Sequence, residues 1–301
     1  MILKNKEILN KILLVVAILL CFVFLSIVEQ PLGFYQQILF SIIICIAVIF
    51  LNLFKGRMIT LILMGVGILI SSRYLWWRYS SSVILNEFPD CLFSVTLLTA
   101  ETYAWFVLLL GYFQVCFPLN RESIPLPENK EEWPIVDILI PTYNEPFTVV
   151  KNTVYGALAL DWPKDKLHIW ILDDGARDEF RKFANESGIY YVARETHEHA
   201  KAGNINNALK IANGEFVAIF DCDHIPSVSF LKKTMGWFIA DKKLSMLQTP
   251  HHFFSPDPFE RNLGQFRQKP NEGHLFYGLI PNGTDTWNDS FFCGSCAIIR
   301  R

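Results

Sequence analysis

Apolar residues run almost without interruption along the first 120 positions, where only short polar segments break them. The apolar stretches lie at about 8–28, 34–54, 58–75 and 91–117. A helix needs roughly 20 such residues to cross the hydrocarbon core of a bilayer. The first stretch is too long for a signal peptide, and no small-residue cleavage site follows it. The pattern therefore predicts four transmembrane helices within residues 1–120.

Basic residues predict the orientation of these helices, because cytoplasmic loops carry an excess of Lys and Arg. With a cytosolic N-terminus, the basic residues on the inside are Lys4, Lys6, Lys11, Lys55, Arg57, Arg121 and Lys130. Only Arg73 and Arg78 then fall outside. Four crossings return the chain to the cytosol, so residues 121–301 are predicted to be cytoplasmic, in a multi-pass membrane protein. A charge facing lipid is costly, so we expect Glu101 to pair with Arg73 or Arg78, or to be protonated and packed between helices, rather than to line a polar path.

After residue 120 the pattern changes to short apolar runs that alternate with helical periodicity. Buried strands are predicted at 135–140, 167–172, 189–193 and 216–220, and helices at 148–160 and 202–212. This alternation is typical of an α/β domain with a mostly parallel sheet flanked by helices. No Gly-x-Gly-x-x-Gly follows a strand and no Walker lysine loop occurs, which argues against dinucleotide-binding and P-loop domains.

Composition argues against several other classes of protein. The chain is 51% hydrophobic with 25 Phe and 8 Trp, which excludes intrinsic disorder. A net charge of −2 without a long basic stripe gives no support for nucleic-acid binding. Among the seven cysteines, Cys293 and Cys296 have Cys-x-x-Cys spacing, but no second pair completes a zinc site. We therefore interpret the cysteines as reduced thiols.

Acidic residues follow two of the predicted strands. Asp173 and Asp174 end the second strand, and Asp221 and Asp223 end the fourth. Ligands of open α/β sheets bind beyond the carboxyl ends of the strands. An Asp-x-Asp pair there can hold Mg²⁺, with a diphosphate supplying further oxygens. Together with Lys201, which opens a nearby helix, these residues predict a site for a metal-bound, phosphate-bearing ligand.

Six motifs occur in order along the chain: Pro141-Thr142-Tyr143-Asn144-Glu145-Pro146, Asp173-Asp174-Gly175, His199-Ala200-Lys201-Ala202-Gly203-Asn204, Asp221-Cys222-Asp223-His224, the segment from His252-Phe253-Phe254 to Arg261-Asn262, and Phe291-Phe292-Cys293-Gly294-Ser295. With the four apolar segments before them, they resemble the family 2 glycosyltransferases, and among these the bacterial cellulose synthase catalytic subunits. The resemblance covers essentially the whole chain. It implies an α-helical membrane bundle followed by a Rossmann-like GT-A domain. It also implies a processive, inverting transfer of glucose from UDP-glucose to β-1,4-glucan, which is fed across the membrane.

The resemblance also assigns roles to matching residues. Those expected to bind the donor are Thr142, Tyr143, Glu145, Asp173, Asp174, Lys201, Asp221 and Asp223. Asp173 is also assigned to the catalytic site, and Asp221 and Asp223 to a Mg²⁺ or Mn²⁺ ion. Those expected beside the end of the growing glucan are Phe292, Cys293, Gly294 and Ser295. For His224, structural and functional roles both remain open.

Several parts of the family pattern do not occur in these 301 residues. They are the Thr-Glu-Asp motif with the expected general base, the Gln-x-x-Arg-Trp motif, later membrane helices, and a C-terminal domain that binds the activator cyclic di-GMP. We therefore expect a truncated GT-A domain over residues 121–301 that is inactive alone. The expected partners are UDP-glucose, the glucan, membrane lipid and a periplasmic accessory subunit. Two alternatives remain, a related synthase making β-1,3-glucan or a hyaluronan-like polymer, and a non-catalytic membrane protein that binds nucleotide sugar.

Overall fold

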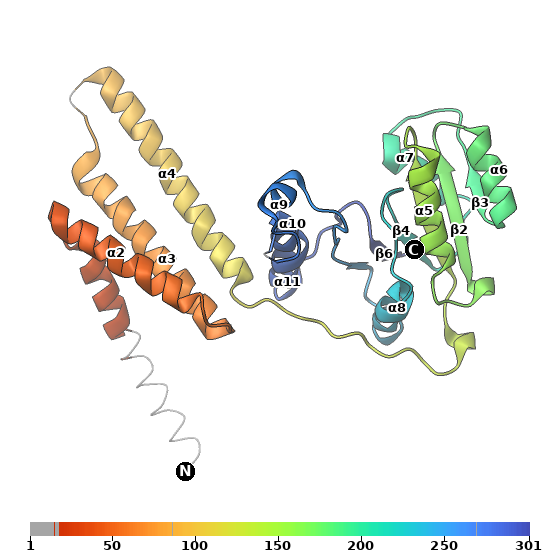
Figure 1. Cartoon of the computed structure of the whole chain (residues 1–301), viewed down its shortest axis with the longest axis horizontal. Coiled ribbons are helices and arrows are strands. Elements are labelled where there is room, and N and C mark those ends of the chain that lie inside the picture. Colours follow the sequence, from red (N-terminus) through yellow and green to blue (C-terminus); the bar gives the residue numbers. More distant parts are fainter. Residues whose placement is uncertain (1–14, 16–17, 86, 269) are drawn as a thin grey trace, which may run out of the picture. The chain divides into compact units, whose positions relative to one another are not determined.

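A computed structural model describes residues 15, 18–85, 87–268 and 270–301. The chain divides into two compact units, Met1–Phe117 and Pro118–Arg301. Their described residues are coloured red to yellow and yellow to blue in Figure 1. The division agrees with the change in hydrophobic pattern near residue 120. The two units are described separately.

The first unit is mainly helical in its described part. A short apolar helix, Ile18–Glu29, precedes α2 (Phe34–Leu51), α3 (Arg57–Trp77) with the π-helical segment η1 (Arg78–Ser82), and α4 (Phe88–Val115). Three helical segments, α2, α3 with η1, and α4, are long and apolar enough to cross a membrane. They coincide with the second, third and fourth predicted spans. Part of the first predicted span lies outside the described residues, and the four membrane crossings stay a prediction.

Glu101 of α4 is paired within this unit. The Arg78 guanidinium donates to one of its carboxylate oxygens from Nε at 2.6 Å, and the Tyr74 hydroxyl donates to the other at 2.6 Å. The expected pairing with Arg78 is confirmed. Arg73 instead donates to the carbonyl oxygens of Ile27 and Gln30 at 2.6 and 2.7 Å.

The second unit is built on a six-stranded sheet in the order β3-β2-β1-β4-β6-β5. The strands are β1 (Val136–Thr142), β2 (Leu167–Asp173), β3 (Tyr190–Val192), β4 (Phe216–Ile219), β5 (Met246–Gln248) and β6 (Ala297–Arg300). The first four are mutually parallel, whereas β6 runs antiparallel to both of its neighbours. The predicted mostly parallel sheet is confirmed.

Helices cover the two faces of the sheet because the apolar strands send alternate residues to opposite sides. In β1, Ile138 and Ile140 join one core, formed with α5 (Phe147–Leu158), α6 (Asp178–Ser187) and α8 (Phe230–Ala240). Leu139 joins the other core, formed with α7 (Ala200–Ala208). Strands buried on both faces read as continuous apolar runs, which explains why the sequence pattern reveals them.

The remaining elements are short. They are η2 (Lys130–Glu132), η3 (Lys164–Lys166), α9 (Pro258–Leu263), α10 (Glu272–His274), η4 (Leu275–Leu279) and α11 (Ile280–Asp285). All four predicted strands and both predicted helices are present, with ends shifted by up to four residues. The helices α6 and α8 and the strands β5 and β6 were not predicted individually.

Candidate active site

The predicted site residues gather at the carboxyl ends of the parallel strands. Thr142 and Asp173 are the last residues of β1 and β2 and lie opposite each other in register. Asp221 follows β4, the other neighbour of β1. The fold therefore brings the ends of three adjacent strands to one edge, where open α/β sheets bind ligands.

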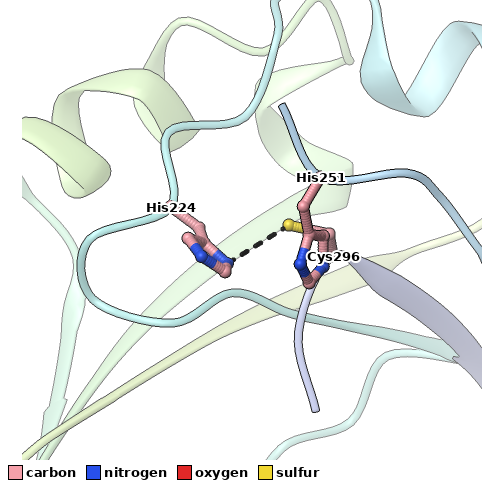
Figure 2. Close-up of side chains that lie close together, drawn as sticks. All are labelled: His224, His251 and Cys296. Atoms are coloured by element: carbon pink, nitrogen blue, oxygen red, sulfur yellow. Dashed lines mark hydrogen bonds between the residues drawn. The ribbon is translucent and has the colours of Figure 1, made fainter. Parts of the chain in front are cut away.

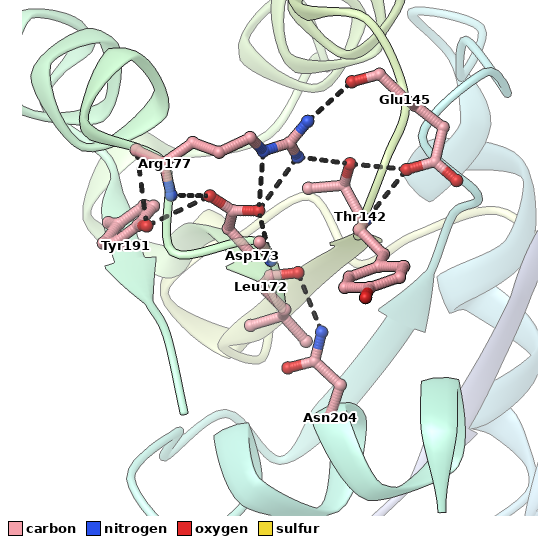
Figure 3. Close-up of polar contacts among 9 residues, drawn as sticks. Thr142, Glu145, Leu172, Asp173, Arg177, Tyr191 and Asn204 are labelled. Carbon is pink, nitrogen blue, oxygen red and sulfur yellow. Dashed lines mark hydrogen bonds and ion pairs between the residues drawn. The ribbon is translucent and has the colours of Figure 1, made fainter. Parts of the chain in front are cut away.

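Asp173 is fully buried, and its carboxylate is saturated with hydrogen bonds (Figure 3). It accepts from the backbone amides of Gly175 and Arg177 at 3.0 and 2.7 Å, and from the Tyr191 hydroxyl at 3.1 Å. The Arg177 guanidinium donates twice more, at 2.9 and 3.1 Å. Burial and the neighbouring Asp173 charge raise the pKa of Tyr191 to about 12. Asp173 thus holds the turn after β2 in shape, and its predicted contact with a nucleotide stays a prediction.

Arg177 joins this turn to the end of β1. Its guanidinium donates to the Thr142 hydroxyl at 3.0 Å and to the Glu145 carbonyl oxygen at 2.7 Å. The Glu145 carboxylate accepts from the Thr142 hydroxyl at 2.7 Å and the Tyr143 amide at 2.8 Å. Burial raises the pKa of Glu145, but these two bonds contribute to a net lowering. The charged carboxylate therefore stabilises the fold at neutral pH, and this contribution falls as the pH drops through the folded-state pKa.

The Tyr143 side chain lies outside this network. It is 53% exposed, and its ring centroid lies 5.7 Å from that of His197. An exposed aromatic ring beside a rigid strand end is suited to stack on a planar ligand.

Asp174 anchors the loop that leads into α7. Arg194 donates to both of its carboxylate oxygens at 2.6 and 2.7 Å, and each side chain is only 8% exposed. Arg194 also donates to the carbonyl oxygens of Glu198 and Ala200 at 2.6 and 2.8 Å. This buried pair therefore fixes the start of α7, the helix that carries Lys201.

Gly203 lets this loop pack against α7, and we expect Gly203→Ala to disrupt it. A Cβ atom there would lie 2.0 Å from the Glu198 carbonyl oxygen and 2.6 Å from the Arg194 guanidinium. Both groups are held by the Asp174 pair, so we expect a loss of about 1–3 kcal/mol in unfolding free energy. Denaturant unfolding of the purified chain measures it. Gly278→Ala, where nothing lies within 4 Å, is the matched control, and equal stability of the two variants would contradict this packing.

Lys201 connects the helix to the end of β4 and to the segment before β6. Its amino group forms an ion pair with Asp221 and donates to the Gly294 carbonyl oxygen at 2.6 Å. Gly294 has a φ of +88°, a conformation that glycine adopts without strain. The structure thus joins a predicted donor residue, a predicted metal ligand and the predicted acceptor segment.

The acceptor segment is tied to the same strand end. Ser295 is fully buried, and its hydroxyl oxygen accepts from the Asp221 amide at 2.8 Å and lies 2.7 Å from Nδ1 of His224. The Cys293 amide donates to the Gln248 side-chain oxygen at 2.9 Å, and burial raises the pKa of its thiol. Phe292 is 41% exposed. Within the acceptor segment, the Phe292 side chain is therefore exposed to solvent, and the buried Ser295 holds the segment in place.

Three side chains offer a set of oxygen and nitrogen ligands for a metal. One ligand atom each from Asp221, Asp223 and His224 lies within 4.8 Å of the others. Asp223 is exposed and Asp221 is half-buried, so a diphosphate has access to an ion between them. Carboxylate oxygens suit Mg²⁺ and Mn²⁺, so Asp221 and Asp223 fit the predicted metal, and the His224 imidazole is a nitrogen ligand beside them.

Comparison with known proteins decides the family. The profile described as "Glycosyl transferase family 2" matches residues 137–301. The chain belongs to glycosyl transferase family 2. The match begins in β1 and includes every other strand of the sheet. All the residues that the sequence predicts as donor or metal ligands lie within it.

Curated relatives of this family 2 glycosyltransferase are named cellulose synthase catalytic subunit [UDP-forming]. One from Pseudomonas fluorescens (strain SBW25) is 51% identical over 277 residues, which are 92% of this chain and 38% of the relative. One from Xanthomonas axonopodis pv. citri (strain 306) is 52% identical over 285 residues, 95% of this chain and 38% of the relative. The chain thus spans 38% of the length of each relative. The predicted resemblance is confirmed.

One solved structure to which the chain is similar is that of a mannosyltransferase from Pyrobaculum calidifontis in complex with GDP-mannose and Mn²⁺. It shares 23% identity, with a TM-score of 0.48, over 68% of this chain and 55% of its own. This likeness is too distant to inform the ligands of the present family member.

Sequence reasoning missed the two arginines that organise the site. Arg177 saturates Asp173, and Arg194 pairs with Asp174. Arg177 follows the acidic turn closely in the sequence, which is a local signal for its pairing. Arg194 lies 20 residues from its partner, and the only available signal is a basic residue just after a predicted strand.

Proposed function

We propose that this chain holds the donor site of a UDP-forming cellulose synthase, which transfers glucose from UDP-glucose to the end of a β-1,4-glucan. The observation that carries the proposal is about 50% identity to cellulose synthase catalytic subunits over more than nine-tenths of the chain. The convergence of Lys201, Asp221 and Asp223 at one sheet edge supports it.

The nucleotide would bind at the ends of β1 and β2. The Tyr143 ring is free to stack on uracil, and Thr142 and Glu145 hold the backbone that carries it. Asp173 and Asp174 would act on the nucleotide through the turn that they stabilise. Lys201 would approach the diphosphate, because its side chain is 39% exposed and its amino group pairs with a metal ligand.

Asp221, Asp223 and His224 would hold the Mg²⁺ or Mn²⁺ ion. When bound, such an ion stabilises negative charge on a departing diphosphate. The Lys201 ammonium adds a second positive charge on the same leaving group. An incoming diphosphate would compete with Asp221 for Lys201. Because Lys201 also donates to the Gly294 carbonyl oxygen, this competition would couple donor binding to the acceptor segment.

On the acceptor side, Phe292, Cys293, Gly294 and Ser295 would lie beside the glucan end, with Phe292 offering an exposed ring. The apolar helices would place the protein in the bacterial inner membrane, with the second unit in the cytoplasm and the glucan passing outward. Activation by cyclic di-GMP and pairing with a periplasmic accessory subunit belong to the same proposal through the resemblance.

Calorimetric titration of the detergent-purified chain with UDP, in the presence of Mg²⁺, tests the donor site. We expect UDP to bind more tightly than GDP or ADP. Because an aromatic stack on a base contributes about 1–3 kcal/mol, Tyr143→Ala should weaken UDP binding roughly 10- to 100-fold. Tyr155→Ala, an exposed tyrosine of α5, is the control. Equal affinity for all three nucleotides, or an unchanged affinity of Tyr143→Ala, would contradict the assignment.

A further inference from the structure

Two histidines and a cysteine from three separate segments meet beside the donor site (Figure 2). His224 follows β4, His251 follows β5, and Cys296 immediately precedes β6. One ligand atom from each lies within 4.8 Å of the others, and all three residues are half-buried. We propose that His224, His251 and Cys296 form a second metal site, the thiolate site, which binds a Zn²⁺-like cation.

The ligand types distinguish this site from the carboxylate set. One thiolate and two imidazoles match Zn²⁺ or another thiophilic cation, whereas Mg²⁺ prefers oxygen ligands. Typical Zn–S and Zn–N bonds of about 2.3 and 2.0 Å in a tetrahedron place sulfur and nitrogen roughly 3.5 Å apart. In the structure, Sγ of Cys296 lies 3.5 Å from Nδ1 of His224. This pair is already spaced as two ligands of one ion.

The surrounding structure holds these ligands in position. The Cys296 amide donates to the Ile219 carbonyl oxygen at 2.7 Å, which ties the cysteine to the end of β4. The His251 ring packs against the Tyr277 ring, with a centroid distance of 4.3 Å. Its Nε2 atom also lies 3.1 Å from the Ser295 carbonyl oxygen. Contacts of this kind, beyond the ligands themselves, orient histidines in metal sites.

Solvent has access to the proposed site. His251 lines a cavity of about 300 Å³ together with Phe253, His274 and Tyr277. A water molecule from this side would complete a tetrahedral set of three protein ligands and one open position. On binding, the Cys296 thiol releases its proton to solvent, and sulfur coordinates as thiolate.

The cysteine spacing in the sequence indicates a different partner for Cys296. Cys293 is its expected neighbour in a Cys-x-x-Cys pair, and the lack of a second pair in the sequence argues against zinc. The structure instead brings two histidines, 72 and 45 positions away in the sequence, to Cys296. The nitrogen atoms of these two histidines take the place of the second cysteine pair as metal ligands.

His224 links the thiolate site to the carboxylate set, and this coupling rests on the proposed function. Its Nδ1 atom lies 2.7 Å from the Ser295 hydroxyl oxygen and 3.5 Å from Sγ of Cys296, while its Nε2 atom lies 3.9 Å from an Asp223 carboxylate oxygen. A neutral imidazole that binds metal through Nδ1 carries its proton on Nε2. That proton would point at Asp223, and Nε2 could no longer bind the donor's metal. A cation in the thiolate site would thus weaken metal-dependent donor binding.

Co²⁺ titration of the purified chain tests the site itself, because a thiolate ligand gives Co²⁺ a sulfur-to-metal charge-transfer band in the near ultraviolet. We expect one equivalent of Co²⁺ to produce the band and Zn²⁺ to remove it. Cys296→Ser should abolish the band, and His251→Gln should weaken Co²⁺ binding by at least the roughly 10–100-fold that is typical for loss of an outer-shell partner. Cys293→Ser should retain the band.

The proposal fails if the wild-type chain gives no band, if the band survives Cys296→Ser, or if Cys293→Ser removes it. Circular dichroism of the variants separates loss of ligand from loss of fold. UDP titration in Mg²⁺ with and without Zn²⁺ tests the coupling, and we expect Zn²⁺ to weaken UDP binding in wild type but not in Cys296→Ser. Failure of UDP to bind at all would count against the proposed function while the Co²⁺ band still reports on the thiolate site.

Discussion

Asp223→Ala is expected to abolish the Mg²⁺-dependent part of UDP-glucose binding. The Asp223 carboxylate is the exposed member of the set formed with Asp221 and His224, and it is the member that a ligand reaches most directly. Loss of an outer-shell partner of a metal ligand typically costs about 10–100-fold in metal affinity, and we expect loss of a ligand itself to cost at least as much, because Mg²⁺ is usually held by only one or two carboxylates plus phosphate oxygens. Donor binding by the variant should therefore become weak and insensitive to Mg²⁺.

Calorimetry with and without Mg²⁺ measures this effect. Asp165→Ala, which removes an exposed carboxylate of η3 away from the strand ends, controls for the loss of negative charge and should bind as wild type does. If Asp223→Ala keeps the wild-type affinity and the same dependence on Mg²⁺, the metal assignment is wrong.

Arg194→Met is expected to destabilise the second unit by about 3–5 kcal/mol, because it leaves the buried Asp174 carboxylate without its partner. Both side chains of this pair are 8% exposed, so solvent cannot compensate for the lost charge. The substitution also removes the bonds to the Glu198 and Ala200 carbonyl oxygens. We therefore expect weaker UDP binding as well, since Lys201 is carried by the helix that starts there.

Denaturant unfolding and UDP titration measure the two effects of Arg194→Met. Arg181→Met is the matched control, since Arg181 pairs with Asp178 at 3.3 Å on the exposed surface, where such pairs contribute about 0–1 kcal/mol. The double variant Asp174→Asn/Arg194→Met should recover part of the lost stability, because no unpaired charge remains. Equal stability of Arg194→Met and Arg181→Met would contradict the anchoring role of the buried pair.

The parallel half of the sheet can be predicted from the sequence because its strands are buried on both faces. Val136–Ile140 and Leu167–Leu172 are dominated by apolar residues, and polar residues follow them where the strands end at the ligand side. The end of each apolar run and the acidic residues that follow it therefore both mark where the strand ends. For this reason the amino-acid pattern alone places Asp173 at the end of β2 and Asp221 just after β4.

The antiparallel edge cannot be predicted in the same way. β5 has three residues, and β6 has four that are paired with β4 about 80 positions earlier. Strands this short have no periodicity of their own, and their pairing is set by tertiary contacts. The meeting of His224, His251 and Cys296 depends on these strands, so no local pattern could show it.

The different roles of the buried carboxylates of Asp173 and Asp174 also cannot be predicted from the local sequence pattern. Asp173 and Asp174 look alike as neighbours in sequence, yet one is saturated by Arg177 and the other by Arg194. The partner of Asp173 lies four residues later in the same turn, whereas the partner of Asp174 comes from a segment 20 residues away. The partner of Glu101 is easier to predict, because a carboxylate among apolar residues has few candidate partners. Arg78, which pairs with it in the structure, is one of the two arginines that the sequence offers.

Glucose incorporation by membranes of cells that produce the natural protein tests the proposed activity most directly. Membranes given radiolabelled UDP-glucose and Mg²⁺ should yield an insoluble product that cellulase degrades and that linkage analysis shows to be β-1,4-linked. Membranes carrying Asp223→Ala at the same protein level should yield none. A product with another linkage, or undiminished synthesis by Asp223→Ala, would contradict the proposal that this site donates glucose to cellulose.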